Sequence, residues 1–533
     1  NSIVKVELPR QKVLIFTKLF FNVYLKNSDM KIRHLFLIAI CAILSSCNSL
    51  ELGPIDHYGL NNYWKTKEQC ERFIIGLHYR MRSRMSATMT MGELRGGTLN
   101  TNAITSIGEG AYDIEIVGNT LSAANPGISN WADFYMDIYQ INHAIDKISN
   151  NCDFLDDKTR KTWLGQLYGL RAWYYFHLLR TFGGVPLCDK PDVLITDNLD
   201  KLDKPRASEQ ETWEFIRNDV DKSCEMYSEL GYTNYKSMNC YWNKGASQCL
   251  KAEVYLWGAK VKPIESSSVY TATVQKDLED ARDALLDAEP NYAPNKNFTD
   301  AFSVKNKDAN KETILAARYL LGEATNHFSN FTYNVSTFTK YFDETGKKLG
   351  NVLNIGAGAL RYEYSLDFWK SFDASDARRN ATFLQFYLKD NDDNLYPAGR
   401  SLKKFLGDLS NGKIQFTNDI PLYRYMDIAL LLAEIYNELG DKAETVKWIN
   451  KVRSRAGVGP YSYTNKEEAE EVILKERTFE FVGEGKRWYD VRRMLDGKYA
   501  LDLVDGNELK LVWPIDAGVL SKDNKVEQNK GYL

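Results

Sequence analysis

The sequence predicts a mainly α-helical protein: degenerate tetratricopeptide-like helix pairs form a scaffold, and an irregular, loop-rich region with a few short strands is inserted into it. Three observations predict this class. Apolar residues recur at helical spacing in both halves of the chain. The period is lost over about residues 290–420, where Gly, Asn, Asp and aromatic residues dominate. The composition, 44% hydrophobic and 26% charged, is globular.

The segment from Met30 to Cys47 has the pattern of a bacterial lipoprotein signal peptide. A basic start precedes the apolar run Leu35–Leu44, which is too short to span a bilayer, and Leu44-Ser45-Ser46-Cys47 looks like a lipobox. The alternative is a buried apolar segment that happens to end in cysteine. The signal-peptide interpretation predicts lipid attachment at Cys47, and therefore a protein held to the membrane by its lipid anchor alone.

Domain boundaries follow from this interpretation. Residues 1–29 begin with Asn and have no clear period, so we expect a non-native upstream extension there, followed by a signal peptide over 30–46. The mature chain, 47–533, is then one binding domain. We expect its helical scaffold over about 60–290 and 420–495, and its loop-rich ligand region over about 290–420.

The charge balance excludes one class of partner. The net charge of the chain is −3, and removal of the basic first 46 residues makes it more acidic. Nucleic-acid binding needs clustered Lys and Arg and a positive field, so we expect no nucleic-acid partner.

Helix signals are clear in the N-terminal half. Apolar residues repeat every three or four positions over 131–148 and over 163–178, and Gly183-Gly184-Val185-Pro186 ends the second run, so two adjacent antiparallel helices are expected. Ser208 and Glu211 form a capping box that opens another helix, and residues 246–257 mark a further one.

In the C-terminal half, residues 422–439 predict a helix that leads into Gly440, and Asp441 caps a second helix that ends at Gly457. Between the two helical parts, the runs 312–319 and 381–387 are prone to form strands. Loops as long as those around them are usually functional in a compact protein.

No arrangement of residues predicts catalysis. Glu476, Glu480 and Glu484, with Arg477 and Arg487, could be imagined as an acid and base pair. Carboxylates stacked on one helix more often make ion pairs with neighbouring helices, which is the structure we expect. The six histidines lack zinc-site spacing, and no nucleophile motif occurs. We expect no catalytic residue, no metal site and no cofactor.

Two smaller patterns leave an alternative open. The acidic turn 390–394 departs from a calcium loop at Leu395 and Ser401, so a solvated turn is the better interpretation. Outside the signal peptide the cysteines lack a framework spacing, so we expect most to be buried thiols, with Cys240 and Cys249 as the local pair whose state stays open.

A run of aromatic and amide residues after residue 318 is the best binding candidate. Flat rings offer apolar faces to a sugar, while amides and hydroxyls can pair with its hydroxyl groups. The alternative is that the rings pin a long loop to the scaffold. The residues predicted to bind a ligand are Tyr319, Phe328, Phe331, Tyr333 and Tyr341, with Tyr112 in the Gly-rich loop that starts near Gly97.

Several blocks, taken together, resemble one family. They are Gly92-Glu93-Leu94-Arg95, Trp131 to Asn142, Leu170 to Tyr175, Arg424-Tyr425-Met426-Asp427, Ile449 to Gly457, Trp513-Pro514-Ile515, and above all the run from Glu476 to Arg493. The chain thereby resembles SusD/RagB nutrient-binding lipoproteins over essentially all of 47–533.

The resemblance implies a non-catalytic protein on the outer membrane of a Bacteroidetes bacterium, lipid-anchored and exposed at the surface. It would capture an oligosaccharide and deliver it to a SusC-like TonB-dependent channel. A peptide ligand, as in RagB-like proteins, is the main alternative. An exported glycan hydrolase and a structural surface lipoprotein are the others.

Overall fold

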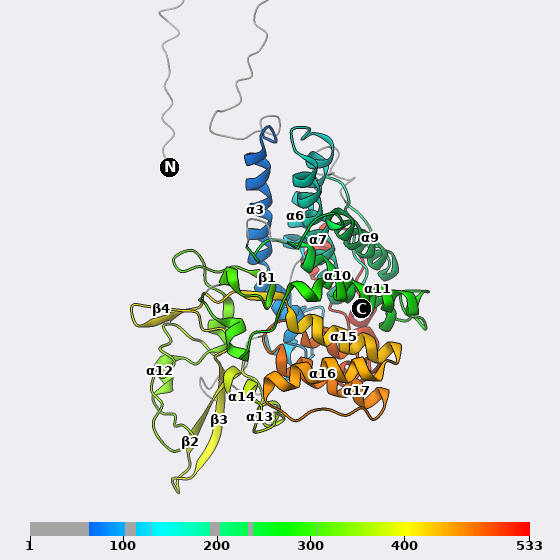
Figure 1. Cartoon of the computed structure of the whole chain (residues 1–533). Coiled ribbons are helices and arrows are strands. Elements are labelled where there is room, and N and C mark those ends of the chain that lie inside the picture. Colours follow the sequence, from blue (N-terminus) through cyan, green and yellow to red (C-terminus); the bar gives the residue numbers. More distant parts are fainter. Residues whose placement is uncertain (1–62, 102–112, 129–130, 192–202, 233–237, 306) are drawn as a thin grey trace, which may run out of the picture. The chain divides into compact units, whose positions relative to one another are not determined.

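The computed structural model describes residues 63–101, 113–128, 131–191, 203–232, 238–305 and 307–533. The predicted signal peptide, Cys47 and Tyr112 lie outside these ranges. Within them, no helix is long and apolar enough to cross a membrane. The arrangement is the predicted one, with a helical scaffold and a loop-rich part, toward the lower left of Figure 1, that holds most of the strands.

The N-terminal part of the scaffold is a group of packed helices, in which α3 packs on α6, α6 on α7, α7 on α9, α9 on α10 and α10 on α11 (Figure 1). The apolar face that the sequence pattern indicated is buried in each long helix, including Ile138 and Ile141 of the first predicted pair. The helices are α3 (Lys67–Ser83), α4 (Met85–Glu93), α5 (Ile114–Val117), α6 (Ala132–Asn150), α7 (Asp157–Phe182), α9 (Glu209–Tyr227), α10 (Lys244–Lys260) and α11 (Val274–Ala288).

The loop-rich region contains three antiparallel two-stranded sheets. They pair β1 (Thr313–Ala317) with β6 (Ile420–Arg424), β2 (Phe383–Lys389) with β3 (Leu395–Leu402), and β4 (Asp408–Ser410) with β5 (Lys413–Gln415). Both predicted strand runs are therefore confirmed. Short helices join them: α12 (Val335–Phe338), α13 (Leu366–Lys370) and α14 (Ala377–Thr382).

The C-terminal helices return to the scaffold and pack against α10 and α11. They are α15 (Tyr425–Leu439), α16 (Lys442–Ala456), α17 (Lys466–Glu480), α18 (Arg487–Arg493), α19 (Lys498–Asp502) and α20 (Ala517–Lys522). Every predicted cap is present. Ser208 and Glu211 cap α9 reciprocally, Asp441 accepts from the Glu444 N–H at the start of α16, and Gly457 ends α16 in the left-handed conformation.

A buried set of ion pairs joins the loop-rich region to these helices, and we call it the central ion-pair network. Its central cation is Arg424, whose guanidinium donates to Glu480 at 2.6 Å and to Glu484 at 2.8 Å. Glu312, just before β1, accepts from Arg424 at 3.1 Å and from Arg455 of α16 at 2.8 Å. The network comprises Glu312, Arg378, Lys404, Arg424, Arg455, Glu476, Glu480 and Glu484.

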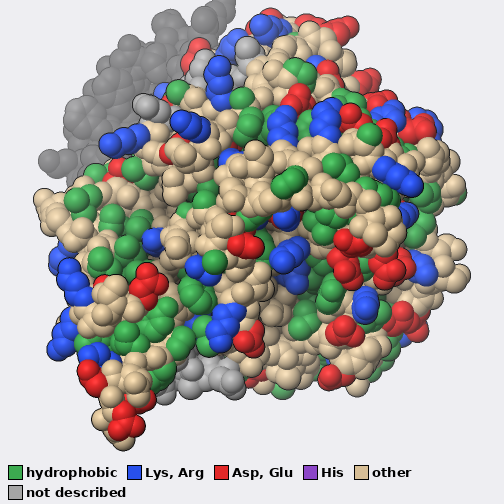
Figure 2. All heavy atoms as spheres, turned by 60° about the horizontal axis from the view of Figure 1, so that its bottom comes forward, with side chains coloured by type: hydrophobic (Ala, Val, Ile, Leu, Met, Phe, Trp, Pro, Cys, Tyr) green, Lys and Arg blue, Asp and Glu red, His purple; other side chains and the backbone are tan. Residues whose placement is uncertain are grey.

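The network confirms the structural interpretation of the three glutamates. Burial raises the pKa of the Glu480 carboxyl, but Arg455, Arg424 and Arg378 outweigh burial, so that pKa lies well below its ordinary value. Carboxylates that pair with buried cations in this way have a structural role in the packing of the fold. On the surface, by contrast, Figure 2 shows acidic and basic side chains interspersed across the visible face, without a basic block of the kind that nucleic acid needs.

Replacing Arg424 by alanine should destabilise the fold strongly. The change leaves the buried carboxylates of Glu480 and Glu484 without their main cation, so we expect a loss of about 3–5 kcal/mol in the free energy of unfolding, measured by denaturant titration. Arg282, whose partner Asp283 is 64% exposed, provides the control, and Arg282→Ala should cost less than about 1 kcal/mol. Equal losses in the two variants would contradict a structural role for the network.

Acid should unfold the protein partly through Glu434 of α15. Burial raises the pKa of this carboxyl, but Arg493 at 2.9 Å and Lys260 at 3.1 Å outweigh burial and bring it to about 2. The unfolded chain then binds the proton first as pH falls, so this stabilisation is complete above about pH 5 and is lost toward pH 2.

The corresponding measurement is the free energy of unfolding from pH 7 to pH 2. The wild type should lose about 3 kcal/mol more over this range than Glu434→Gln, because glutamine cannot take up the proton. Glu344→Gln, at an exposed position, should follow the wild type. Parallel curves for wild type and Glu434→Gln would contradict the assignment.

Candidate functional site

The segment Gly92–Arg95 ties the N-terminal helices to the C-terminal part of the chain. A Cβ atom on Gly92 would lie 1.7 Å from the carbonyl oxygen of Gly485, so only glycine fits where α4 meets the turn after α17. Gly485 itself has a φ of +71°, in the left-handed region. Two glycines far apart in sequence therefore permit one close backbone contact.

Glu93 makes this contact polar. Its carboxylate accepts hydrogen bonds from the N–H groups of Gly483 at 3.1 Å and Gly485 at 3.2 Å, and from the hydroxyl of Tyr364 at 2.8 Å. Burial raises the pKa of the Glu93 carboxyl, and the hydrogen bonds from Gly483 and Tyr364 oppose that rise. One side chain thus links α4, the turn after α17 and the loop-rich region.

Arg95 holds the loop that follows. Its fully buried guanidinium donates to the side-chain oxygen of Asn119 at 2.7 Å and to the carbonyl of Lys510 at 2.7 Å, and it lies over the Trp488 ring at 4.2 Å. Burial lowers the pKa of this guanidinium, which has neutral oxygens as its hydrogen-bond acceptors. Arg95 therefore ties the short segment after α4 to Asn119 and to Lys510.

This segment meets the loop-rich region directly. Leu99 forms an antiparallel bridge with Tyr364, flanked by hydrogen bonds of 2.8 Å from Asn100 N–H to the Glu363 carbonyl and from Ser365 N–H to the Thr98 carbonyl. We call Thr98–Thr101, Asp113–Ile114 and Arg361–Ser365 the loop junction.

At the loop junction, the Tyr362 hydroxyl donates to the carboxylate of Asp113, just beyond the part of the loop that the structure leaves undescribed. The side chains of Arg361 and Ile114 are exposed beside these residues. The junction therefore presents a guanidinium and a carboxylate next to a hydrophobic side chain, whereas the Tyr362 ring is only 8% exposed.

The structure packs four of the predicted ligand-binding rings behind the loop junction. Phe331 lies 4.9 Å from the Tyr362 ring, Phe328 stacks on Phe405 at 4.1 Å, and Tyr333 stacks on Phe338 at 3.7 Å. Phe328, Phe331, Tyr333 and Tyr341 are each at most 2% exposed. Their packing is the alternative that the sequence left open, in which the rings pin the loop region to the scaffold. A direct contact with ligand stays a prediction.

Tyr319 lies apart from these rings. Its hydroxyl donates to the Arg82 carbonyl at 3.4 Å, and the Arg82 guanidinium lies 5.8 Å from the centre of the Tyr319 ring and 4.7 Å from that of Tyr79. Tyr79 is 59% exposed. Tyr112 is outside the described residues, so its place as a ligand-binding residue stays a prediction as well.

Sequence reasoning missed Arg361, Tyr362 and Asp113. No periodic pattern marks them, because they lie in irregular backbone whose partner segment is far away in sequence. The signal that could have found Tyr362 is its position in a short aromatic run that also contains Tyr364.

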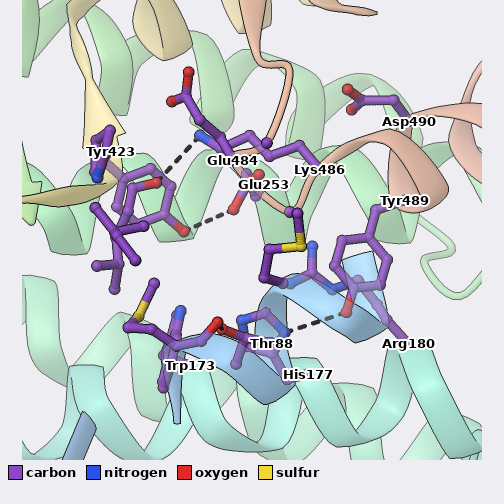
Figure 3. A pocket seen from close by; sticks show the side chains of 17 residues that line it. Thr88, Trp173, His177, Arg180, Glu253, Tyr423, Glu484, Lys486, Tyr489 and Asp490 are labelled. Atoms are coloured by element: carbon purple, nitrogen blue, oxygen red, sulfur yellow. Dashed lines mark hydrogen bonds between the residues drawn. The ribbon is translucent and has the colours of Figure 1, made fainter. Parts of the chain in front are cut away.

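A separate cavity between α4, α7, α10 and β6 is too small for a sugar. Its volume is about 50 Å³, against roughly 300–1,000 Å³ for ordinary ligand pockets. Figure 3 shows its polar lining already paired: Tyr423 donates to Glu253 at 2.6 Å, and His177 and Tyr489 lie 3.2 Å apart. The cavity has room for water alone.

A larger groove of about 470 Å³ lies at the start of α9, against the C-terminal residues 525–530. Its charged groups are engaged within the protein: Arg206 donates to the carbonyls of Gly184 and Phe182, and Lys530 pairs with Glu265 at 2.6 Å. The groove has no aromatic lining residue. It lacks the ring surface that favours sugar binding.

Other site types are not formed by the described residues. No group of three or more His, Cys, Asp and Glu side chains in these ranges could hold a metal ion. The acidic turn joins β2 to β3, and Asp390 there accepts the N–H groups of Asp392 and Asn394, as in a solvated turn. Cys240 and Cys249 are both free thiols.

The described part of the chain is thus a helical scaffold that carries a loop-rich region with a polar junction. A model of the SusD family matches residues 291–503, and a second, described as "Starch-binding associating with outer membrane", matches residues 78–256. A SusD superfamily protein from Bacteroides fragilis is 34% identical, with a TM-score of 0.79 over 88% of this chain and 100% of that one. The chain belongs to the SusD family.

Two further relatives agree. B. fragilis NanU is 29% identical, with a TM-score of 0.78 over 90% of this chain and 99% of that one. SusD-like protein P38 of Formosa agariphila is 26% identical over 551 residues, which cover 95% of this chain and all of the relative. Members of the SusD family are non-catalytic binding proteins. The alternative of an exported glycan hydrolase is therefore excluded.

Glu93→Ala should loosen the loop junction. The variant leaves the hydroxyl of Tyr364 and the N–H groups of Gly483 and Gly485 without their acceptor, so we expect a loss of about 3 kcal/mol or more in the free energy of unfolding. Hydrogen exchange at residues 98–100 should also become faster. Glu344→Ala, in an exposed turn, should leave both measurements unchanged.

Proposed function

We propose that this protein captures an oligosaccharide at the bacterial surface and passes it to a SusC-like TonB-dependent channel in the outer membrane. Family membership supports this function, as does the description of the model that matches the N-terminal half, which names starch binding and outer-membrane association. The lipobox at Cys47 supports a lipid-anchored position at that membrane.

We place the ligand at the loop junction. The bridge between Leu99 and Tyr364 is the observation that carries this placement, because it brings the loop after Gly97 against the aromatic region in which the sequence predicted binding. Arg361 and Asp113 can pair with sugar hydroxyl groups, and the exposed Ile114 side chain offers an apolar contact. The buried rings, Phe331 foremost, would then support the site from behind.

A peptide ligand is the second candidate. It is favoured by the same pair of opposite charges, Arg361 and Asp113, which could pair with a peptide's terminal groups or charged side chains. A purely structural lipoprotein would bind its membrane partner without any such ligand.

The test is calorimetric binding to a panel of plant, host and microbial glycans, with a peptide pool alongside, using the chain from Asn48 onward. We expect saturable binding of one glycan class, weakened at least about tenfold in Arg361→Ala with an unchanged melting temperature. Tyr396→Ala is the matched control, since this ring is exposed on the separate β2–β3 hairpin. Equal binding by both variants would move the site away from the loop junction.

Phe331→Ala distinguishes a supporting ring from a contacting one. A supporting ring that is 2% exposed should lower the melting temperature when truncated, in parallel with any loss of binding. Lost binding at an unchanged melting temperature would instead support direct contact with ligand. Binding of peptides alone would overturn the sugar assignment, and no binding across the panel would favour the structural role.

A further inference from the structure

Two cysteines from separate elements face each other inside the N-terminal scaffold. Cys70 lies in the first turns of α3, and Cys152 lies in the turn between α6 and α7, 82 residues later. Their sulfurs are 3.7 Å apart, and both residues are 0% exposed. Among the described cysteines, no other pair of sulfurs is in contact.

The backbones around both residues are held in place. One turn before Cys70, the Lys67 amine donates to the Asp156 carboxylate at 3.1 Å and to the Thr159 hydroxyl at 2.8 Å, at the start of α7. On the other side, Arg160 donates to the Cys152 carbonyl at 2.9 Å. The facing position of the sulfurs is therefore set by several neighbouring contacts.

We propose that Cys70 and Cys152 are joined by a disulfide bond in the exported protein. A disulfide measures about 2.05 Å, so the sulfurs must approach by less than about 2 Å, which rotation about the two Cα–Cβ bonds and a slight shift of α3 can supply. The proposal rests on the export step of the proposed function, since disulfides persist outside the cytoplasm.

The oxidant is a disulfide-bearing thiol oxidoreductase of the cell envelope. One cysteine thiolate attacks a sulfur of the donor disulfide, forming a mixed disulfide and releasing one donor thiolate, which takes up a proton. The second cysteine thiolate attacks the mixed disulfide and releases the other donor thiolate. The protein thereby loses two protons and two electrons, and the donor gains both.

Burial dictates when this exchange occurs. It raises the pKa of the Cys70 thiol to about 12, and it raises that of Cys152 as well, so little thiolate exists once α3 has packed. Oxidation therefore precedes the packing of α3.

The bond would secure the helix that follows the lipid anchor in sequence. The start of α3 is otherwise held by the buried side chains of Cys70 and Ile74, by the hydrogen bond from Trp64 to His143 at 3.1 Å just before the helix, and by surface contacts such as Lys67 with Asp156. Any pull along the membrane tether reaches α3 first. A covalent link to the α6–α7 turn would carry part of that load in addition to these noncovalent contacts.

The test uses the full chain, exported by its own signal into the envelope of a Bacteroidetes host. Cells are lysed under denaturing conditions with N-ethylmaleimide, and the protein is digested and analysed by mass spectrometry. We expect a linked peptide pair that contains Cys70 and Cys152, with alkylation restricted to the other described cysteines. Reductant should lower the melting temperature by about 5 °C.

Matched variants separate the cross-link from a packing effect. Cys70→Ala with Cys152→Ala should abolish the reductant-dependent shift, whereas Cys224→Ala with Cys240→Ala should retain it, since these two thiols lack a sulfur neighbour. Protein found in the membrane fraction with Cys70 and Cys152 both alkylated would overturn the disulfide and leave the capture function intact. Protein confined to the cytosol would overturn both.

Discussion

The pairing of Arg424 with Glu480 and Glu484 is the constraint on which the rest of the structure depends. These charges lie where β6, the start of α15 and the turn after α17 meet, so the loop-rich region cannot dock on the helices unless every partner arrives in register. A buried charge without its partner costs several kcal/mol, whereas an apolar contact tolerates displacement. The ion pairs thus give the attachment of an irregular region a specificity that its loops alone would lack.

The segment Gly92–Arg95 extends this constraint to the proposed binding surface. Glu93 connects the turn after α17 to Tyr364, while Arg95 connects α18 and the C-terminal segment to Asn119. The loop junction itself is held by the backbone hydrogen bonds around Leu99 and Tyr364 and by the hydrogen bond from the Tyr362 hydroxyl to Asp113. A site of this kind combines a rigid base with loops whose sequence can change without disturbing the fold, and loops positioned by a rigid scaffold commonly carry binding residues.

The helical parts could be predicted because their signals are local. A capping box at Ser208, a glycine at 457 and apolar spacing of three or four residues depend on neighbours within one or two turns. The ion pairing of Glu476, Glu480 and Glu484 could also be anticipated, because their spacing in the sequence predicts that they stack on one helix face. The burial of Phe331 and Tyr333 could not be predicted, because it depends on which distant rings cover them. An aromatic ring suits a core and a sugar platform equally. For the same reason the sequence did not indicate the meeting of Asp113 with Tyr362.

The hydrogen bonds from Gly483 and Gly485 to Glu93 span 390 and 392 residues of sequence. Closing contacts of this range cannot form until nearly the whole chain has been synthesised. A chain that emerges from the ribosome without its last hundred residues lacks the N–H donors of Gly483 and Gly485 and the carboxylates of Glu480 and Glu484 that pair with Arg424, so its core is incomplete. For the exported protein that we propose, which crosses a membrane before it folds, this late closure is an advantage. The same long-range contacts that stabilise the finished structure would delay its formation until translocation is almost complete.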